Sequence, residues 1–297
     1  MIHFLTHQNR DRVSSYLDQD PLHNIYLIHA LQNCGLKSEH VTFWGTSNGD
    51  QLEGVLFADN DYTHRFGSLA GDNAKVLARL GKFALKSGIR ILAGKDTSIQ
   101  PIVENLPAQF LITHVEHLKF YHVYPEKFRG RHGYPVQRAT RDDIPLLVEL
   151  YKNYELGGRK PPEEIEREIH KAMDKKGNYF FLKSQGRAVS AARIFPQTDR
   201  VGMIDGATTL PEYRGRGMYA CVRTACLEHL FEQKKIGVGL VNQNNATVQR
   251  VVNKQGGSFI AQWLIVRFNK RPPLRRRILA PRLRRWALNV RDTILNH

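Results

Sequence analysis

The stretch from residue 201 to residue 245 constrains this chain more than any other part of its sequence. A strand-like run, Val201–Thr209, precedes a turn containing Arg214-Gly-Arg-Gly217, and residues 220–233 have the apolar periodicity of a helix. Glycines let a backbone approach a ligand closely, and the unpaired N–H groups of a first helical turn favour an anion. The arrangement predicts a phosphate-binding site, in which Arg214 and Arg216 donate to phosphate oxygens. An ordinary tight turn is the alternative.

The residues around this turn favour the phosphate site. Pro-Glu-Tyr-Arg-Gly-Arg-Gly after a strand resembles the acyl-CoA-binding turn of the GNAT family of N-acetyltransferases, whose pattern is Gln/Arg-x-x-Gly-x-Gly/Ala. The turn here reads Arg214-Gly215-Arg216-Gly217-Met218-Tyr219, so that Tyr219 stands where the family has Gly or Ala. The resemblance implies that residues 214–219 bind the diphosphate of acyl-CoA.

A second segment resembles the same family. Residues 245–257 are similar to the GNAT pattern Asn-x-x-Ala/Ser-x-x-x-(Tyr)-x-Lys-x-Gly, and Asn245, Lys254 and Gly256 match it. The resemblance implies that Asn245 contacts the cofactor. Val252 takes the place of the family's frequent tyrosine, which often protonates the leaving thiolate.

The resemblance also implies how the chain divides. The first half has the element order of a GNAT domain but lacks the Arg-x-x-Gly-x-Gly turn near residues 69–73. We therefore expect a degenerate GNAT-like domain over 1–125 with a structural role. A second acyl-CoA site and an unrelated α+β domain are the alternatives. A linker over 126–135, a GNAT acyltransferase domain over 136–270 and a basic amphipathic tail over 271–297 follow. The expected fold class is α+β, with a mixed central sheet flanked by helices in each domain and a helical tail.

The linker prediction depends on the breakers and charges of residues 125–135. The segment contains Arg-Gly-Arg-His-Gly, which has glycines and arginines as the phosphate turn does. No helical pattern follows it, so we interpret it as a solvated connection.

The chemistry that the resemblance implies is acyl transfer from a thioester to an amine. The family typically has a β-bulge in the strand before the turn, so that the main chain of Ala207, Thr208 and Thr209 would pair with the pantetheine arm. A general base is harder to assign. Asp205 is the nearest carboxylate on that strand, and a hydrogen-bonded structural acid is the alternative interpretation.

Charge and composition add partners to these expectations. Residues 270–297 hold nine Lys or Arg and one Asp, which is half of the formal net charge of +16. The alternatives for this tail are binding to nucleic acid, to an anionic membrane surface or to an acidic protein, and docking on the body of the protein through Trp286. Three cysteines without a Cys-x-x-Cys pair, and no signal-peptide pattern, favour a cytoplasmic protein without a zinc site.

The sequence therefore predicts an acyl-CoA-dependent N-acyltransferase, most simply one that moves acetyl from acetyl-CoA to an amine, without a metal. The alternatives are a protein that binds acyl-CoA without turnover and a nucleic-acid-associated protein whose tail does the main work. The acceptor, the oligomeric state and the acid and base stay open.

Overall fold

The computed structural model describes residues 1–61, 65–152 and 160–272. The chain forms two compact units that are not contiguous in sequence. The N-terminal unit contains residues 1–16 and 34–117 and the chain from Trp263 onward, and the C-terminal unit contains residues 17–33 and 118–262. The predicted division into 1–125 and 136–270 thus differs from the observed units, because each unit includes a segment from the other half of the sequence.

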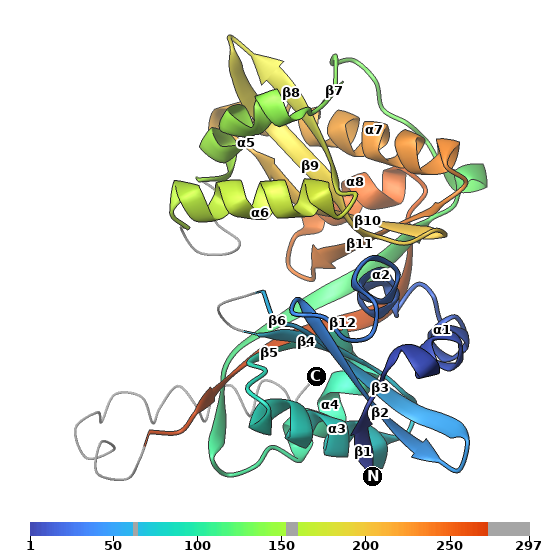
Figure 1. Ribbon diagram of the computed structural model, residues 1–297. Coiled ribbons are helices and arrows are strands. Elements are labelled where there is room, and N and C mark those ends of the chain that lie inside the picture. The colour runs from blue at the N-terminus through green and yellow to red at the C-terminus, as the bar shows by residue number, and fades with distance from the viewer. Residues whose placement is uncertain (62–64, 153–159, 273–297) are drawn as a thin grey trace. The chain divides into compact units, whose positions relative to one another are not determined.

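The N-terminal unit is a mixed sheet with helices packed against it (Figure 1). Its sheet has the order β1-β2-β3-β4-β5-β12, and β4 and β5 are its parallel pair. A turn at Gly49, which has a φ of 55°, joins β2 to β3, and α3 begins after Asn73. The elements are β1 (Ile2–Phe4), η1 (His7–Asn9), α1 (Arg10–Leu17), β2 (Val41–Asn48), β3 (Gln51–Asp59), β4 (Phe66–Ala70), α3 (Ala74–Lys86), β5 (Ile91–Lys95), α4 (Asp96–Glu104), β6 (Phe110–Val123) and β12 (Ser258–Lys270).

The C-terminal unit repeats this plan. Its sheet has the order β6-β11-β10-β9-β8-β7, and β10 and β11 are its parallel pair. The elements are α2 (Ile25–Cys34), η2 (Pro125–Lys127), β7 (Gln137–Arg138), η3 (Arg141–Asp143), α5 (Ile144–Tyr151), α6 (Pro162–Asp174), β8 (Asn178–Ser184), β9 (Arg187–Gln197), β10 (Val201–Thr209), η5 (Pro211–Tyr213), α7 (Met218–Glu232), β11 (Ile236–Asn242) and α8 (Ala246–Lys254).

Each unit completes its sheet with a strand that continues from the other unit. The last part of β6, from Leu118, pairs with β11 in the C-terminal unit, and the last part of β12, from Trp263, pairs with β5 in the N-terminal unit. In both units an antiparallel strand therefore follows the parallel pair. The fold class is the predicted one, with two units of mixed sheet and helices.

Helix α7 packs closely on the sheet of the C-terminal unit (Figure 1). Its buried residues Val222, Leu227 and Leu230 belong to the core of this unit. Gly202 and Gly237 face these leucines, and a Cβ on either glycine would collide with them. The small residues on β10 and β11 thus allow the second half of α7 to pack closely on the sheet.

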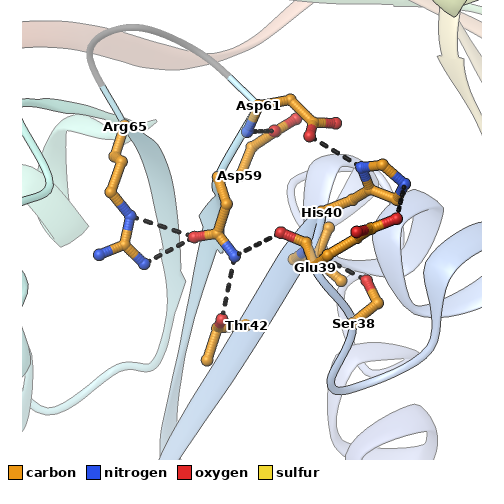
Figure 2. Close-up of polar contacts among 9 residues, drawn as sticks. Ser38, Glu39, His40, Thr42, Asp59, Asp61 and Arg65 are labelled. Atoms are coloured by element: carbon orange, nitrogen blue, oxygen red, sulfur yellow. Dashed lines mark hydrogen bonds and ion pairs between the residues drawn. The ribbon is translucent and has the colours of Figure 1, made fainter.

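The polar residues around His40 form a separate cluster in the N-terminal unit (Figure 2). Asp61 lies 2.8 Å from His40 Nδ1, and Asn60 accepts hydrogen bonds from the guanidinium of Arg65 and donates one to Thr42. These contacts join the beginning of β2 to the end of β3 and the beginning of β4. They lie at the opposite end of β4 from the turn at residues 71–73, so they support the sheet rather than a phosphate turn.

The basic tail that was predicted for 271–297 lies almost entirely outside the described residues, of which Arg271 and Pro272 are the last. Among the described residues, no helix is both long and apolar enough to cross a membrane.

Candidate functional site

The parallel strands β10 and β11 separate before either of them ends. Their pairing stops at Ile204 and Gly239, whereas β10 continues beside β9 to Thr209 and β11 continues beside β6 to Asn242. Residues 205–209 therefore have no strand partner on the β11 side within the described parts of the chain. Such an unpaired edge can bind an extended ligand through main-chain hydrogen bonds.

A β-bulge shapes this edge at Gly206. The register between β10 and β9 shifts between Asp205 and Thr208, and Gly206 has a φ of 60°. The Gly206 N–H donates to Asp205 Oδ1 over 2.6 Å, and the Tyr151 hydroxyl on α5 donates to the Gly206 carbonyl over 2.7 Å. The bulge expected from the family resemblance is therefore present, and side chains from two elements hold it in place.

Asp205 is part of this support. Its Oδ2 accepts a hydrogen bond of 2.8 Å from Arg193 on β9, and Arg193 also donates to the Tyr179 hydroxyl. Burial alone would lower the pKa of Arg193, but Asp205 raises it well above its usual value. Both Asp205 oxygens are thus engaged, and a proton on this carboxylate would weaken the ion pair. The geometry favours the structural role of Asp205 over the role of a base.

The glycine-rich turn leaves the beginning of α7 open. Gly217 is the N-cap of α7 with a φ of 82°, and the helix has no side-chain cap hydrogen bond among the described residues. Gly215 has a φ of 77°, so that two left-handed residues bend the chain between η5 and α7. The helix dipole and its free N–H groups favour an anion at this position.

Arginine side chains surround this turn. Arg214 and Arg216 are exposed. Arg214 Nε donates to the Thr209 carbonyl over 3.1 Å, and Arg216 lies over the ring of Tyr213. Both guanidinium groups keep N–H donors available for phosphate oxygens.

The other predicted cofactor residues have different environments. Ala207, Thr208 and Thr209 form the end of β10, where the Ser190 hydroxyl contacts the Thr208 carbonyl and the Thr209 hydroxyl. Met218 is buried and Tyr219 is half-buried, and burial raises the pKa of Tyr219. Asn245 caps α8 by accepting a hydrogen bond from the Val248 N–H.

Val252 faces an apolar cluster rather than a polar site. It is buried on α8 with Tyr121 of β6 and Val241 of β11, and Val248 packs against them. The tyrosine that the family often has at this position is therefore replaced by a core residue.

The sequence did not reveal several polar residues of this unit. Arg193 stands alone in the apolar run of β9, which could have indicated a buried charged partner. Arg223, buried on α7, donates to Gln255 Oε1, and Gln255 donates to the Ala220 carbonyl. This pair joins the end of α8 to the first turns of α7, and the spacing of the two residues in sequence gave no signal for it.

The residues of this region fit an acyl-CoA. They offer an unpaired strand edge for an extended arm, an uncapped helix N-terminus beside it, and exposed arginines for phosphates. No cluster of His, Cys, Asp and Glu that could hold a metal ion occurs within residues 1–61, 65–152 and 160–272.

The chain is similar in fold to solved structures. A crystal structure of an acetyltransferase of the GNAT family from Novosphingobium aromaticivorans superposes with a TM-score of 0.56 at 15% identity, covering 84% of this chain and 98% of that one. A GNAT acetyltransferase from Colwellia psychrerythraea gives 0.57 at 14% identity, with 91% and 100% covered.

A protein with two such domains is also similar. A tandem GNAT protein from the clavulanic acid biosynthesis pathway gives a TM-score of 0.59 at 10% identity and covers 92% of this chain and 99% of that one. These likenesses show the fold, including its tandem form. No curated protein sequence matches the chain.

The match in sequence is confined to the C-terminal unit. The model of the family described as "Acetyltransferase (GNAT) family" matches residues 144–256, which contain the bulge, the glycine-rich turn and Asn245. Residues 144–256 are therefore a GNAT acetyltransferase domain.

Proposed function

We propose that the C-terminal unit is an acyl-CoA-dependent N-acyltransferase, most simply one that transfers acetyl from acetyl-CoA to an amine. One observation carries the proposal: the edge of β10 that lies unpaired at the bulge leads directly into the uncapped N-terminus of α7. An extended arm and a diphosphate need these two features in this order.

The residues of the site have separate tasks in this proposal. The α7 turn, Arg214 and Arg216 bind the phosphates, and the main chain of Ala207–Thr209 aligns the pantetheine arm. Main-chain N–H groups at the bulge would stabilise negative charge on the thioester oxygen, which is worth about 3 kcal/mol in comparable sites. The thiolate that leaves has a pKa near that of other thiols, so it needs no strong acid.

A binding protein without turnover is the second candidate. It is favoured by the burial of Val252 in an apolar cluster and by the engagement of both Asp205 oxygens. In this case the site would hold acyl-CoA, but no side chain at the bulge would remove a proton from the acceptor amine.

Release of free thiol from acetyl-CoA in the presence of a panel of amines separates the two candidates. The proposal expects amine-dependent release that is lost in Arg214→Glu/Arg216→Glu. CoA binding in a calorimetric titration without thiol release for any amine would favour the binding protein. Absence of CoA binding would contradict both.

The tail over residues 271–297 is proposed to bind an anionic partner, nucleic acid or a membrane surface, because of its arginine content. A chain truncated after Lys270 should lose retention on heparin and on anionic vesicles. Unchanged retention on both would remove this proposal without affecting the acyltransferase site.

A further inference from the structure

Residues 128–134, which follow η2, contact α7 at several places along its length, although residues 129–134 are exposed. The ring of Phe128 contacts that of Phe231 at a centroid distance of 5.2 Å, near the end of α7. The Arg131 N–H donates to Thr224 Oγ1 over 2.8 Å in the middle of the helix. The Tyr134 hydroxyl lies 3.4 Å from the Arg216 carbonyl, just before the helix begins. The segment therefore runs antiparallel to α7 from its last turn to its first (Figure 1).

This path places the side chain of Arg131 at the glycine-rich turn. A Cβ built on Gly217 would lie 2.5 Å from Arg131 Cζ and 2.9 Å from its Nε. The guanidinium thus occupies the space beside the N-cap of α7, and Gly217 is the residue that leaves this space open. The side chain of Arg131 is exposed, so that a ligand can reach it.

The charges at this turn lack a compensating anion. Within the described parts of the chain, no carboxylate pairs with Arg131, Arg214 or Arg216. A helix N-terminus disfavours cations, so that the Arg131 guanidinium beside Gly217 lies in an unfavourable position when no anion is present. A bound diphosphate would reverse this effect, because its oxygens would accept from the helix N–H groups and from the guanidinium groups together.

We propose that Arg131 is a phosphate-binding residue of the acyl-CoA site, contacting the diphosphate opposite Arg214 and Arg216. The inference rests on the proposed function, since it assumes that the α7 turn holds this diphosphate. It assigns a ligand-binding role to a segment that lies outside the matched residues 144–256. The loop before the domain would thereby complete the site of the domain.

Substitution of Arg131, with Arg129 as a matched control, tests the assignment in the full-length chain. Arg129 lies two residues earlier in the same segment, is exposed, and donates to the Phe128 carbonyl instead of facing the turn. We expect Arg131→Ala to weaken CoA binding about tenfold, because a hydrogen bond to a charged group is lost. Arg131→Lys should lose less, and Arg129→Ala less than twofold.

A second ligand and a measurement of thermal stability separate the possible explanations of a change in CoA affinity. With 3′-dephospho-CoA as the ligand, Arg131→Ala should cause the same fold-loss, because the diphosphate is retained. Loss of the effect with this ligand would overturn the diphosphate assignment. Equal CoA affinity for Arg131→Ala and the wild type would overturn the role of Arg131 altogether, whereas a wild type that binds no CoA would instead contradict the proposed function. Melting temperatures within about 2 °C of wild type are expected, because the Arg131 contact with Thr224 uses the backbone N–H.

Discussion

The two units have the same strand order, but their turns after the corresponding strand differ. In the C-terminal unit β10 leads to Gly217, which leaves the beginning of α7 without a side-chain cap. In the N-terminal unit β4 leads to Asn73, whose side chain accepts hydrogen bonds from the N–H groups of Lys75 and Val76. The same helix terminus is thus open to an anion in one unit and closed by the protein itself in the other.

The strands before these turns also differ, and the difference again favours a ligand in the C-terminal unit only. β10 has a bulge between Asp205 and Thr208, where its register with β9 shifts. β4 pairs with β3 without a shift from Phe66 to Ala70. The residue before Asn73 is Asp72, an acid where the other turn has arginines. Two units with the same strand order can therefore differ in their capacity to bind an anion. The N-terminal turn has a side-chain cap, a strand without a bulge and an acidic residue, and each of these disfavours an anion.

The largest effect is expected from reversing the charge of the C-terminal turn. Arg214→Glu/Arg216→Glu should weaken CoA binding by about two to three orders of magnitude, because two charge-assisted contacts are replaced by repulsion. The matched change in the N-terminal unit is Lys75→Glu/Lys82→Glu, on exposed positions of α3. Calorimetric titration should give wild-type affinity for this control, and a loss there would break the comparison.

A pH effect tests whether α2 stabilises the unit that carries the site. His29 on α2 contacts the Gln197 carbonyl at 2.7 Å, and burial lowers its pKa from 6.5 to about 4. The unfolded chain therefore binds a proton between these values when the folded chain does not, so that stability falls as the pH decreases from 6.5 to 4. The loss should approach about 3 kcal/mol.

Denaturant unfolding of the wild type and of His29→Gln at several pH values measures this effect. The variant should show a weaker dependence of the free energy of unfolding on pH over the same range. Parallel pH profiles for the two proteins would mean that His29 is not the group responsible.

A substitution of Asp205, which supports the bulge, is expected to have an intermediate effect on stability. Asp205→Asn should lower the free energy of unfolding by about 2 kcal/mol, because Arg193 then lies half-buried without a countercharge. Asp205→Glu, which keeps the charge, should lose less. A variant Asp205→Asn that melts like the wild type but loses turnover would instead identify Asp205 as the base.

The smallest effects are expected from substitution of the residues that cap α3 and α8. Asn73→Ala should lower the free energy of unfolding by about 1 kcal/mol and leave CoA affinity unchanged. Asn245→Ala, which removes the cap of α8, should cost a similar amount and also weaken CoA binding if Asn245 contacts the cofactor as the resemblance predicts. Equal affinities for Asn245→Ala and wild type would limit Asn245 to its capping role.

Local features of the fold could be predicted because local residues cause them. The strand β10 has the predicted bounds, Val201–Thr209. The bulge itself was expected only from the resemblance, and the structure shows why it persists there. Gly206 permits the positive φ, and Tyr151 and Asp205 hold its carbonyl and N–H.

Features that depend on distant partners were not predictable in this way. The hydrophobic periodicity of β6 and β12 does not indicate that each strand belongs partly to both units, because a strand has the same pattern with any neighbour. The 128–134 segment has few apolar residues and is fixed mainly through a backbone N–H and the ring of Phe128. Its contact with the turn therefore required the structure.

Amide hydrogen exchange with and without CoA tests the central claim most directly, since it reports both turns in one experiment. The claim is that the C-terminal turn binds the cofactor and that the corresponding N-terminal turn does not. CoA should slow exchange over residues 205–220 and leave residues 70–77 unchanged. Protection of residues 70–77, or no protection of residues 205–220 at saturating CoA, would contradict it.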